Sequence, residues 1–178
     1  MHSLPTAGRA RAAGLAVLFA LLALPLAGCI SGDVTGGLFT PAHAGATVVK
    51  VDGRSAAAII SSYRAQNGLG PVSVNSRLNA LAEKQARAMA AADRMSHNVG
   101  SPFRARLDAS GYFVRTAGEN IAAGYSDFED VFDRWRNSAP HRNNLLMRGA
   151  TQIGIGKAYA PGTRYKVFWS LIVAAPEG

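Results

Sequence analysis

The chain lacks the means to form an internal disulfide, because Cys29 is the only cysteine among its 178 residues. Acidic residues are also scarce, since 11 of them stand against 19 lysines and arginines, which gives a formal net charge of +8. No second long apolar run follows residues 15–29. The rest of the chain must therefore be stabilised by burial of a hydrophobic core, and roughly 125 residues are enough for one such core.

The one long apolar run has the features of an export signal. Arg9 and Arg11 precede it, it is short for a stable membrane anchor, and it ends in small residues. Its last four residues, Leu26-Ala27-Gly28-Cys29, resemble the lipobox of bacterial lipoproteins, which are cut before the cysteine and carry lipid on it. We expect residues 1–28 to be a lipoprotein signal peptide and Cys29 to be lipidated. The alternative is an ordinary cleaved signal followed by an incidental cysteine.

These features place the chain at the cell envelope, held to a membrane through lipidated Cys29. Residues 29–48 are rich in glycine and predict a flexible tether with a span of roughly 25 Å. Ile30, where an aspartate often marks inner-membrane retention, favours the outer membrane of a two-membrane cell, facing the periplasm or the surface. Removal of residues 1–28 leaves a charge of +6. Anionic lipid or envelope polymers, and no nucleic acid, are the expected partners, unless the basic surface serves solubility alone.

The folded part, residues 49–176, begins with helical patterns. Apolar spacing and capping residues predict helices from Ser55 to Gly68, from Asn75 to about Ala92, from Ser101 to before Gly111, from Ser126 through Trp135, and from Pro140 through Leu146. Ser55, Asn75 and Ser101 are the expected N-caps, and Ser126 with Glu129 fits a capping box.

The last third of the chain alternates as strands do. Residues 153–156 and 165–173 predict two strands joined by a hairpin turn at residues 160–163, and residues 117–123 predict a third, weaker strand. Gly154 and Gly156 are interpreted as strand positions against which another segment packs closely. Helices followed by an antiparallel sheet indicate an α+β fold or a layered α-β-α sandwich.

Three residues of the folded part could carry chemistry. His97 and His141 lie beside small polar residues, and Glu119 lies in an otherwise apolar stretch. Two imidazoles and one carboxylate are a known composition for catalytic zinc, and the same groups could form an acid–base pair with water. Each histidine taken alone is more often a hydrogen-bonded structural residue, and Glu119 alone could simply accept backbone amides.

The motifs together resemble a CAP (SCP/PR-1-like) domain of the short bacterial type, over about residues 54–174. The matching segments are Tyr63-Arg64, 67–72, Ser96-His97, 118–122, 134–138 with His141, 144–146, 153–156 and 165–169. The resemblance implies a three-layer α-β-α sandwich with a central antiparallel sheet and a cleft that holds His97 and His141, a pair able to bind zinc in many members. Glu119 matches the first glutamate of the family's cleft, whereas Ser138 stands where the second is usual. Glu119, Asn120 and Ser138 are therefore expected to support the cleft.

The missing second carboxylate weighs against catalysis, which often needs a pair of acids. We expect a non-enzymatic binding module at the envelope, for a lipid, cell-wall or protein ligand, with at most a weak zinc site at His97 and His141. A lipid would require an apolar groove from residues such as Phe103, Tyr112 and Phe113. The alternatives are a metal-dependent hydrolase of peptide or peptidoglycan that uses His97, Glu119 and His141, and a structural scaffold. Arg104, Arg106 and Arg115 are expected in solvent, the alternative being that they face an anionic ligand near the cleft. The oligomeric state stays open.

Overall fold

The computed structural model describes residues 45–177, so the expected signal peptide, Cys29 and most of the expected tether lie outside the described residues. Five strands and five helices follow one another within this part of the chain. The helices are α1 (Gly53–Gln66), α2 (Ser76–Ala91), α3 (Phe103–Ala109), α4 (Phe128–Asn137) and α5 (Ala139–Leu145). The strands are β1 (Thr47–Val49), β2 (Ser73–Val74), β3 (Val114–Ala123), β4 (Gln152–Tyr159) and β5 (Val167–Pro176).

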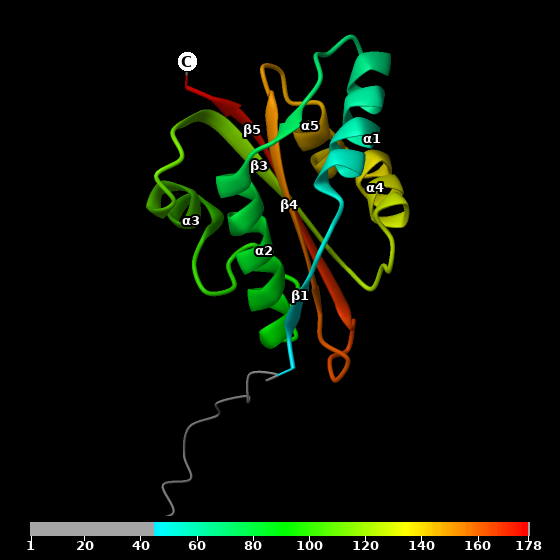
Figure 1. Cartoon of the computed structure of the whole chain (residues 1–178), viewed down its shortest axis with the longest axis vertical. Helices are drawn as coiled ribbons and strands as arrows, with labels where there is room; N and C mark the ends of the chain where they lie inside the picture. Colours follow the sequence, from blue (N-terminus) through cyan, green and yellow to red (C-terminus); the bar gives the residue numbers. More distant parts are fainter. Residues whose placement is uncertain (1–44, 178) are drawn as a thin grey trace, which may run out of the picture. The chain divides into compact units, whose positions relative to one another are not determined.

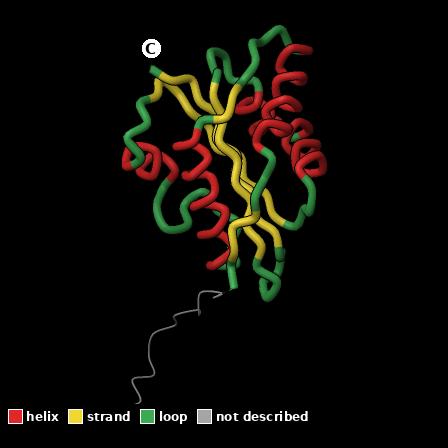
Figure 2. Tube along the Cα trace, viewed as in Figure 1, coloured by secondary structure: helices red, strands yellow, loops and turns green. Residues whose placement is uncertain are grey.

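The strands form one sheet with the order β1-β4-β5-β3, in which these neighbours are antiparallel, while the short β2 pairs with β4 in parallel. Helices α2 and α3 cover one face of the sheet, and α1, α4 and α5 cover the other (Figures 1 and 2). The expected three-layer α-β-α sandwich is therefore confirmed. None of the helices among residues 45–177 is long and apolar enough to cross a membrane.

Each face of the sheet has its own hydrophobic core. Trp135, Phe132, Ile60 and Leu171 belong to the core under α1, α4 and α5. Met89 and Phe168 belong to a core under α2, and Leu107 packs in a further cluster with the start of that helix. The strands can be apolar on both sides for this reason, and the alternation expected for residues 165–173 becomes an unbroken buried run in β5.

Gly154 and Gly156 let α2 approach β4 closely. A Cβ atom on Gly154 would collide with the backbone of Leu78 and Asn79, and one on Gly156 would collide with the backbone of Ala82 and Glu83. The expectation that another segment packs closely against these glycines is confirmed, and the segment is the helix backbone itself.

Several expected helix starts differ from the structure. Asp52, and not Ser55, caps α1, because its carboxylate accepts the backbone N–H groups of Arg54 and Ser55. Pro102 occupies the cap position of α3, and Asp127 that of α4, without side-chain capping bonds, so the proposed Ser126–Glu129 capping box is wrong. Asn75 caps α2 as expected. Ser55 is the first hydroxyl before the apolar run, but the helix begins earlier, so the carboxylate three residues before Ser55 reaches the free amides of its first turn.

The ends of the sheet also differ from expectation. β1 begins at Thr47, inside the segment expected to end the tether, and pairs with the end of β4. β5 begins at Val167, because residues 163–166 belong to the hairpin connection, where Lys166 has a φ of 63°. The expected third strand, residues 117–123, extends back to Val114.

A buried arginine fixes the connection that follows α5. Arg64 on α1 is 1% exposed, and its guanidinium donates to the backbone oxygens of Gly70, Leu145, Met147 and Ala150 at 2.8–3.1 Å. This single side chain therefore connects α1 to both the loop before β2 and the loop between α5 and β4. Because α5 carries His141, Arg64 also holds one wall of the candidate site in place.

Candidate functional site

The expected cleft residues lie around β3, the strand at one edge of the sheet. Successive side chains of a strand point to opposite faces of its sheet, so Glu119 and Asn120 point into the helical layers on opposite faces. Glu119 contacts His97, which lies in the loop after α2. Asn120 donates to the backbone oxygen of His141 on α5. The strand thus links the two histidines from opposite sides of the sheet.

Glu119 is fully occupied by protein partners. Its side chain is 1% exposed, and both carboxylate oxygens lie 3.0 Å from Nη2 of Arg106. Ser170 of β5 donates to Oε1 at 3.2 Å, and Nδ1 of His97 lies 2.8 Å from Oε2. The buried carboxylate thus has an opposite charge and two further hydrogen-bond partners around it. The carboxylate is therefore a fixed counter-ion, with no oxygen left free for proton transfer to a substrate.

The same network orients His97. An ionised carboxylate can only accept hydrogen bonds, so Nδ1 of His97 carries the proton in this contact and Nε2 is left as the basic nitrogen. The ring is 47% exposed, and Arg106 holds its backbone by donating to the carbonyl oxygen at 3.0 Å. His97 is thus a half-exposed imidazole on a rigid support.

His141 has a different support. Its Nδ1 lies 2.9 Å from Oγ of Ser138, the residue between α4 and α5. Asn144 donates to the side-chain oxygen of Asn120 at 2.8 Å, and it packs against Gly118 so closely that a Cβ there would collide. Asn120 and Ser138 thus both contact the His141 segment directly. The amide network fixes α5 against the edge strand.

Burial lowers the pKa of His141 below its ordinary value, and the charge of nearby His97 lowers this pKa further. A group with a lowered pKa in the folded chain favours folding above its unfolded pKa of about 6.5, and this contribution is lost as the pH falls. We expect the free energy of unfolding of the wild type to decrease more steeply from about pH 7 to pH 5 than that of His141→Gln. Denaturant titrations in metal-free buffer test this, and parallel pH profiles would contradict it.

A pocket of about 250 Å³ opens beside His141. Its lining is mixed: Met95, Ile121, Ala122, Ala123, Tyr125, Arg134, Trp135, Ser138 and His141. Trp135 is 1% exposed, donates through its indole to the Ile121 oxygen and belongs to the core beneath the pocket. Arg134 is exposed and places a positive charge at the rim.

The residues present do not fit a catalytic zinc site. Such a site needs three protein ligands, and residues 45–177 contain no group of three or more His, Cys, Asp or Glu side chains placed to hold one ion. Glu119, the expected third ligand, is bound to Arg106, whose own positive charge lies beside it. Metal binding by His97 and His141 alone stays a prediction.

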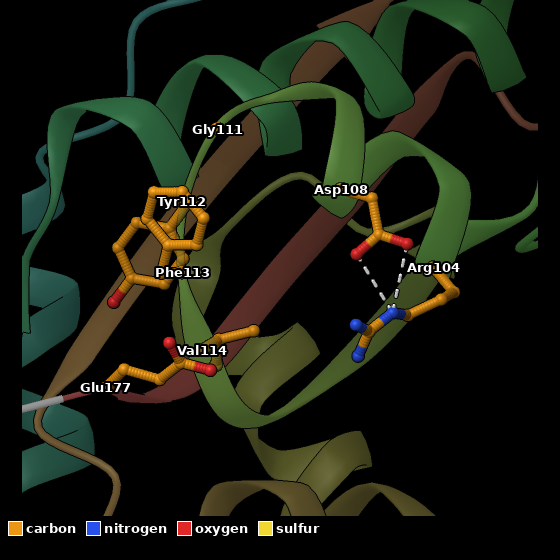
Figure 3. Close-up of a pocket in the computed structure, with 7 residues that line it drawn as sticks. All are labelled: Arg104, Asp108, Gly111, Tyr112, Phe113, Val114 and Glu177. Atoms are coloured by element: carbon orange, nitrogen blue, oxygen red, sulfur yellow. Dashed lines mark hydrogen bonds and ion pairs between the residues drawn. The ribbon is translucent and has the colours of Figure 1, made fainter.

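A second hollow lies away from the histidines, at the start of β3 (Figure 3). It measures about 280 Å³ and is lined by Tyr112, Phe113, Glu177 and the ion pair of Arg104 and Asp108, among others. Tyr112 and Phe113, two of the three residues named for a lipid groove, line this hollow together with charged side chains, and lipid binding stays a prediction. Phe113 is 76% exposed, whereas Phe103 and Tyr112 pack against the core.

Arg106 is the site residue that sequence reasoning missed. It was grouped with Arg104 and Arg115 as a solvated arginine, but it is 8% exposed and its Nη2 pairs with Glu119. No local signal marks it, since three arginines lie in the same segment and only the packing of α3 selects one. Ser170, in a strand of apolar residues, could have been noticed as a polar residue at a core position.

A comparison with protein families decides what the chain is. The model of the cysteine-rich secretory protein (CAP) family matches residues 58–173, most of the chain. The chain belongs to the CAP family. The resemblance drawn from the motifs is thereby confirmed, and the fold described above is that of a CAP domain.

Bacterial proteins are among the similar sequences and structures. The uncharacterized protein YkwD of Bacillus subtilis is 35% identical over 101 residues, which are 55% of this chain and 39% of that protein. An extracellular SCP-domain protein from Bacillus anthracis has a TM-score of 0.59 at 24% identity, covering 68% of this chain and 39% of its own. An outer surface protein from Borrelia burgdorferi has a TM-score of 0.65 at 15% identity, covering 74% and 98%. The chain thus spans about two fifths of the length of the Bacillus proteins, and the structural matches establish the fold.

Proposed function

We propose that the chain is an exported bacterial lipoprotein, anchored through Cys29, whose CAP domain binds one group of a cell-wall ligand without turning it over. One observation carries the proposal. Glu119, the only carboxylate of the expected cleft set, is committed to Arg106, Ser170 and His97. A general acid or base must be able to exchange a proton with its substrate, and this carboxylate is buried and saturated.

Export and anchoring are supported by sequence and by the character of similar proteins. The segment Leu26-Ala27-Gly28-Cys29 follows a short apolar run, as in lipoprotein signals. The Bacillus anthracis match is described as extracellular and the Borrelia burgdorferi match as an outer surface protein. A single acyl chain binds a membrane only marginally, so a firm anchor implies the multiply acylated cysteine of the lipoprotein class.

The pocket beside His141 suggests what kind of ligand enters. Its volume of about 250 Å³ is below the range of roughly 300–1,000 Å³ of pockets that enclose a whole drug-sized molecule. It therefore fits one group of a longer ligand. Arg134 at the rim, hydroxyl and imidazole groups on the wall and an apolar floor favour a carboxylate-bearing group. The peptides of the bacterial cell wall present such groups in large numbers.

Cosedimentation with purified peptidoglycan tests the proposal. The protein is residues 29–178 with Cys29→Ser, so that no lipid is attached. We expect Arg134→Gln to weaken binding about 10-fold, which corresponds to the loss of one charge-assisted hydrogen bond of about 1.5 kcal/mol. Arg136→Gln is the matched control, because Arg136 lies two residues further along α4 and pairs with Asp133 outside the pocket. Equal binding by the wild type and the Arg134 variant would reject the cleft as the binding site.

A further inference from the structure

One end of the domain is defined by where the preceding chain enters. Thr47 pairs with Tyr159, the last residue of β4, whereas the opposite end of the sheet holds Val114 paired with Pro176. The connection from β4 to β5 and the residues after α2 lie at the same end as Thr47, since Asp93 accepts the backbone N–H of Arg164. We call residues 46–48, 92–95 and 159–166 the hairpin end. It lies at the bottom of Figure 1, where the described chain begins.

Exposed apolar side chains are concentrated at the hairpin end. Five large apolar residues are exposed in the described part of the chain, and three of them, Val48, Met95 and Tyr159, belong to this end. They are 41%, 48% and 42% exposed. Tyrosine is enriched at membrane–water interfaces, where its ring and its hydroxyl group are both satisfied.

The same end carries exposed positive charge. Arg94, Arg164 and Lys166 are exposed there. The acids at this end are Asp93 within the three segments and the exposed Asp127 of the adjoining β3–α4 loop, whose Gly124 donates to the Val167 oxygen. Both carboxylate oxygens of Asp93 accept the Arg164 backbone N–H, so this acid is oriented toward the hairpin backbone. No ion pair neutralises the three cations among residues 45–177. Cations beside exposed apolar groups are the chemistry that anionic lipid head groups attract.

We propose that the hairpin end docks on an anionic membrane surface and orients the domain on it. The inference rests on the lipid anchor proposed above. Cys29 precedes Gly45 by 16 residues, which span at most about 55 Å and on average roughly 22 Å. An anchor at Cys29 therefore keeps the hairpin end, where the tether enters, close to the membrane at high local concentration. Met95 also lines the cleft, so docking places the cleft opening beside the membrane surface.

Vesicle cosedimentation tests the docking surface apart from the anchor. Residues 29–178 with Cys29→Ser are mixed at low ionic strength with vesicles of phosphatidylglycerol and phosphatidylethanolamine, or of phosphatidylcholine alone. Each lysine or arginine near such a surface contributes about a 5-fold change in partitioning, so Arg94→Gln with Lys166→Gln should weaken binding to anionic vesicles about 25-fold. The side chains of both residues make no hydrogen bond or ion pair within residues 45–177, so folding should be unaffected.

The matched control removes the same charge from the far end of the sheet. Arg115 and Arg148 are exposed, and Arg115 contacts Pro176 there. Arg115→Gln with Arg148→Gln should change binding less than 2-fold. Equal losses for the two pairs would show attraction by overall charge and overturn the proposal, as would no preference for anionic vesicles. The protein in this assay carries no lipid, so the assay tests the docking surface alone. The anchor is tested separately, by incorporation of labelled palmitate at Cys29 in cells. Failure of one is therefore distinguishable from failure of the other.

Discussion

Replacement of Arg64 by methionine is expected to lower the free energy of unfolding by about 4 kcal/mol. The guanidinium donates to four backbone oxygens, and each buried acceptor that loses its donor costs about 1–3 kcal/mol. Methionine replaces only the aliphatic stem of the side chain and has no donor, and the relief of a buried charge offsets part of the loss. No carboxylate pairs with Arg64 within residues 45–177, so backbone oxygens alone stabilise this charge.

Equilibrium denaturation in urea measures the effect. Arg54→Met is the control, because Arg54 lies on the same helix and is exposed, and surface changes of this kind stay within about 0.5 kcal/mol. If Arg64→Met does not fold at 25 °C, Arg64→Lys keeps the charge and fewer of the bonds, and should be less stable than the wild type yet folded. A loss below about 1 kcal/mol in Arg64→Met would contradict the role assigned to this residue.

The second large effect is expected at Glu119. Replacement by leucine leaves Arg106 buried and charged without its counter-ion, and breaking one partner of a buried ion pair costs about 3–5 kcal/mol. Without Glu119, the acceptors left to the Arg106 guanidinium within the described residues are the carbonyl oxygens of Ser101 and His97. His97 also loses the acceptor of its Nδ1 proton. The melting temperature should fall accordingly.

A double-mutant cycle separates this ion pair from general damage to the core. Arg106→Met alone should also be strongly destabilised, because it leaves the Glu119 carboxylate unpaired. The double variant Arg106→Met with Glu119→Leu removes both charges. Its loss in the free energy of unfolding should be smaller than the sum of the two single losses by at least about 2 kcal/mol. Additive losses would mean that the two residues act independently, against the geometry of the site.

Much of the architecture follows from patterns in the sequence. Apolar spacing located α2 and α4, alternation located β4 and β5, and the glycines of β4 indicated a close neighbour before its identity was known. The parallel pairing of the two-residue β2 could not be predicted, because Ser73 and Val74 form too short a segment to show a period. Nor could the cap at Asp52, since several polar residues near a helix start compete for the same amides.

The candidate site, too, could be predicted from the sequence only in part. His97, Glu119 and His141 were identified from the motifs that resemble a CAP domain, and β3 contacts the segments of both histidines. What the sequence did not reveal is that the carboxylate is bound by Arg106. An exposed and a buried arginine look alike in a sequence, and only tertiary packing of α3 on the sheet decides which one meets Glu119. That contact changes the interpretation of Glu119 from a candidate ligand or base to a counter-ion.

The most direct test of the account is to measure binding and turnover together on purified peptidoglycan. Two proteins are compared: residues 29–178 with Cys29→Ser, and the same protein with His97→Ala and His141→Ala added. Each is incubated with the polymer with and without zinc, and soluble fragments are analysed by mass spectrometry. The account predicts saturable binding that depends on Arg134 and no fragments released under either condition. Fragments released by the first protein and not by the double histidine variant would contradict it and make the cleft a hydrolytic site.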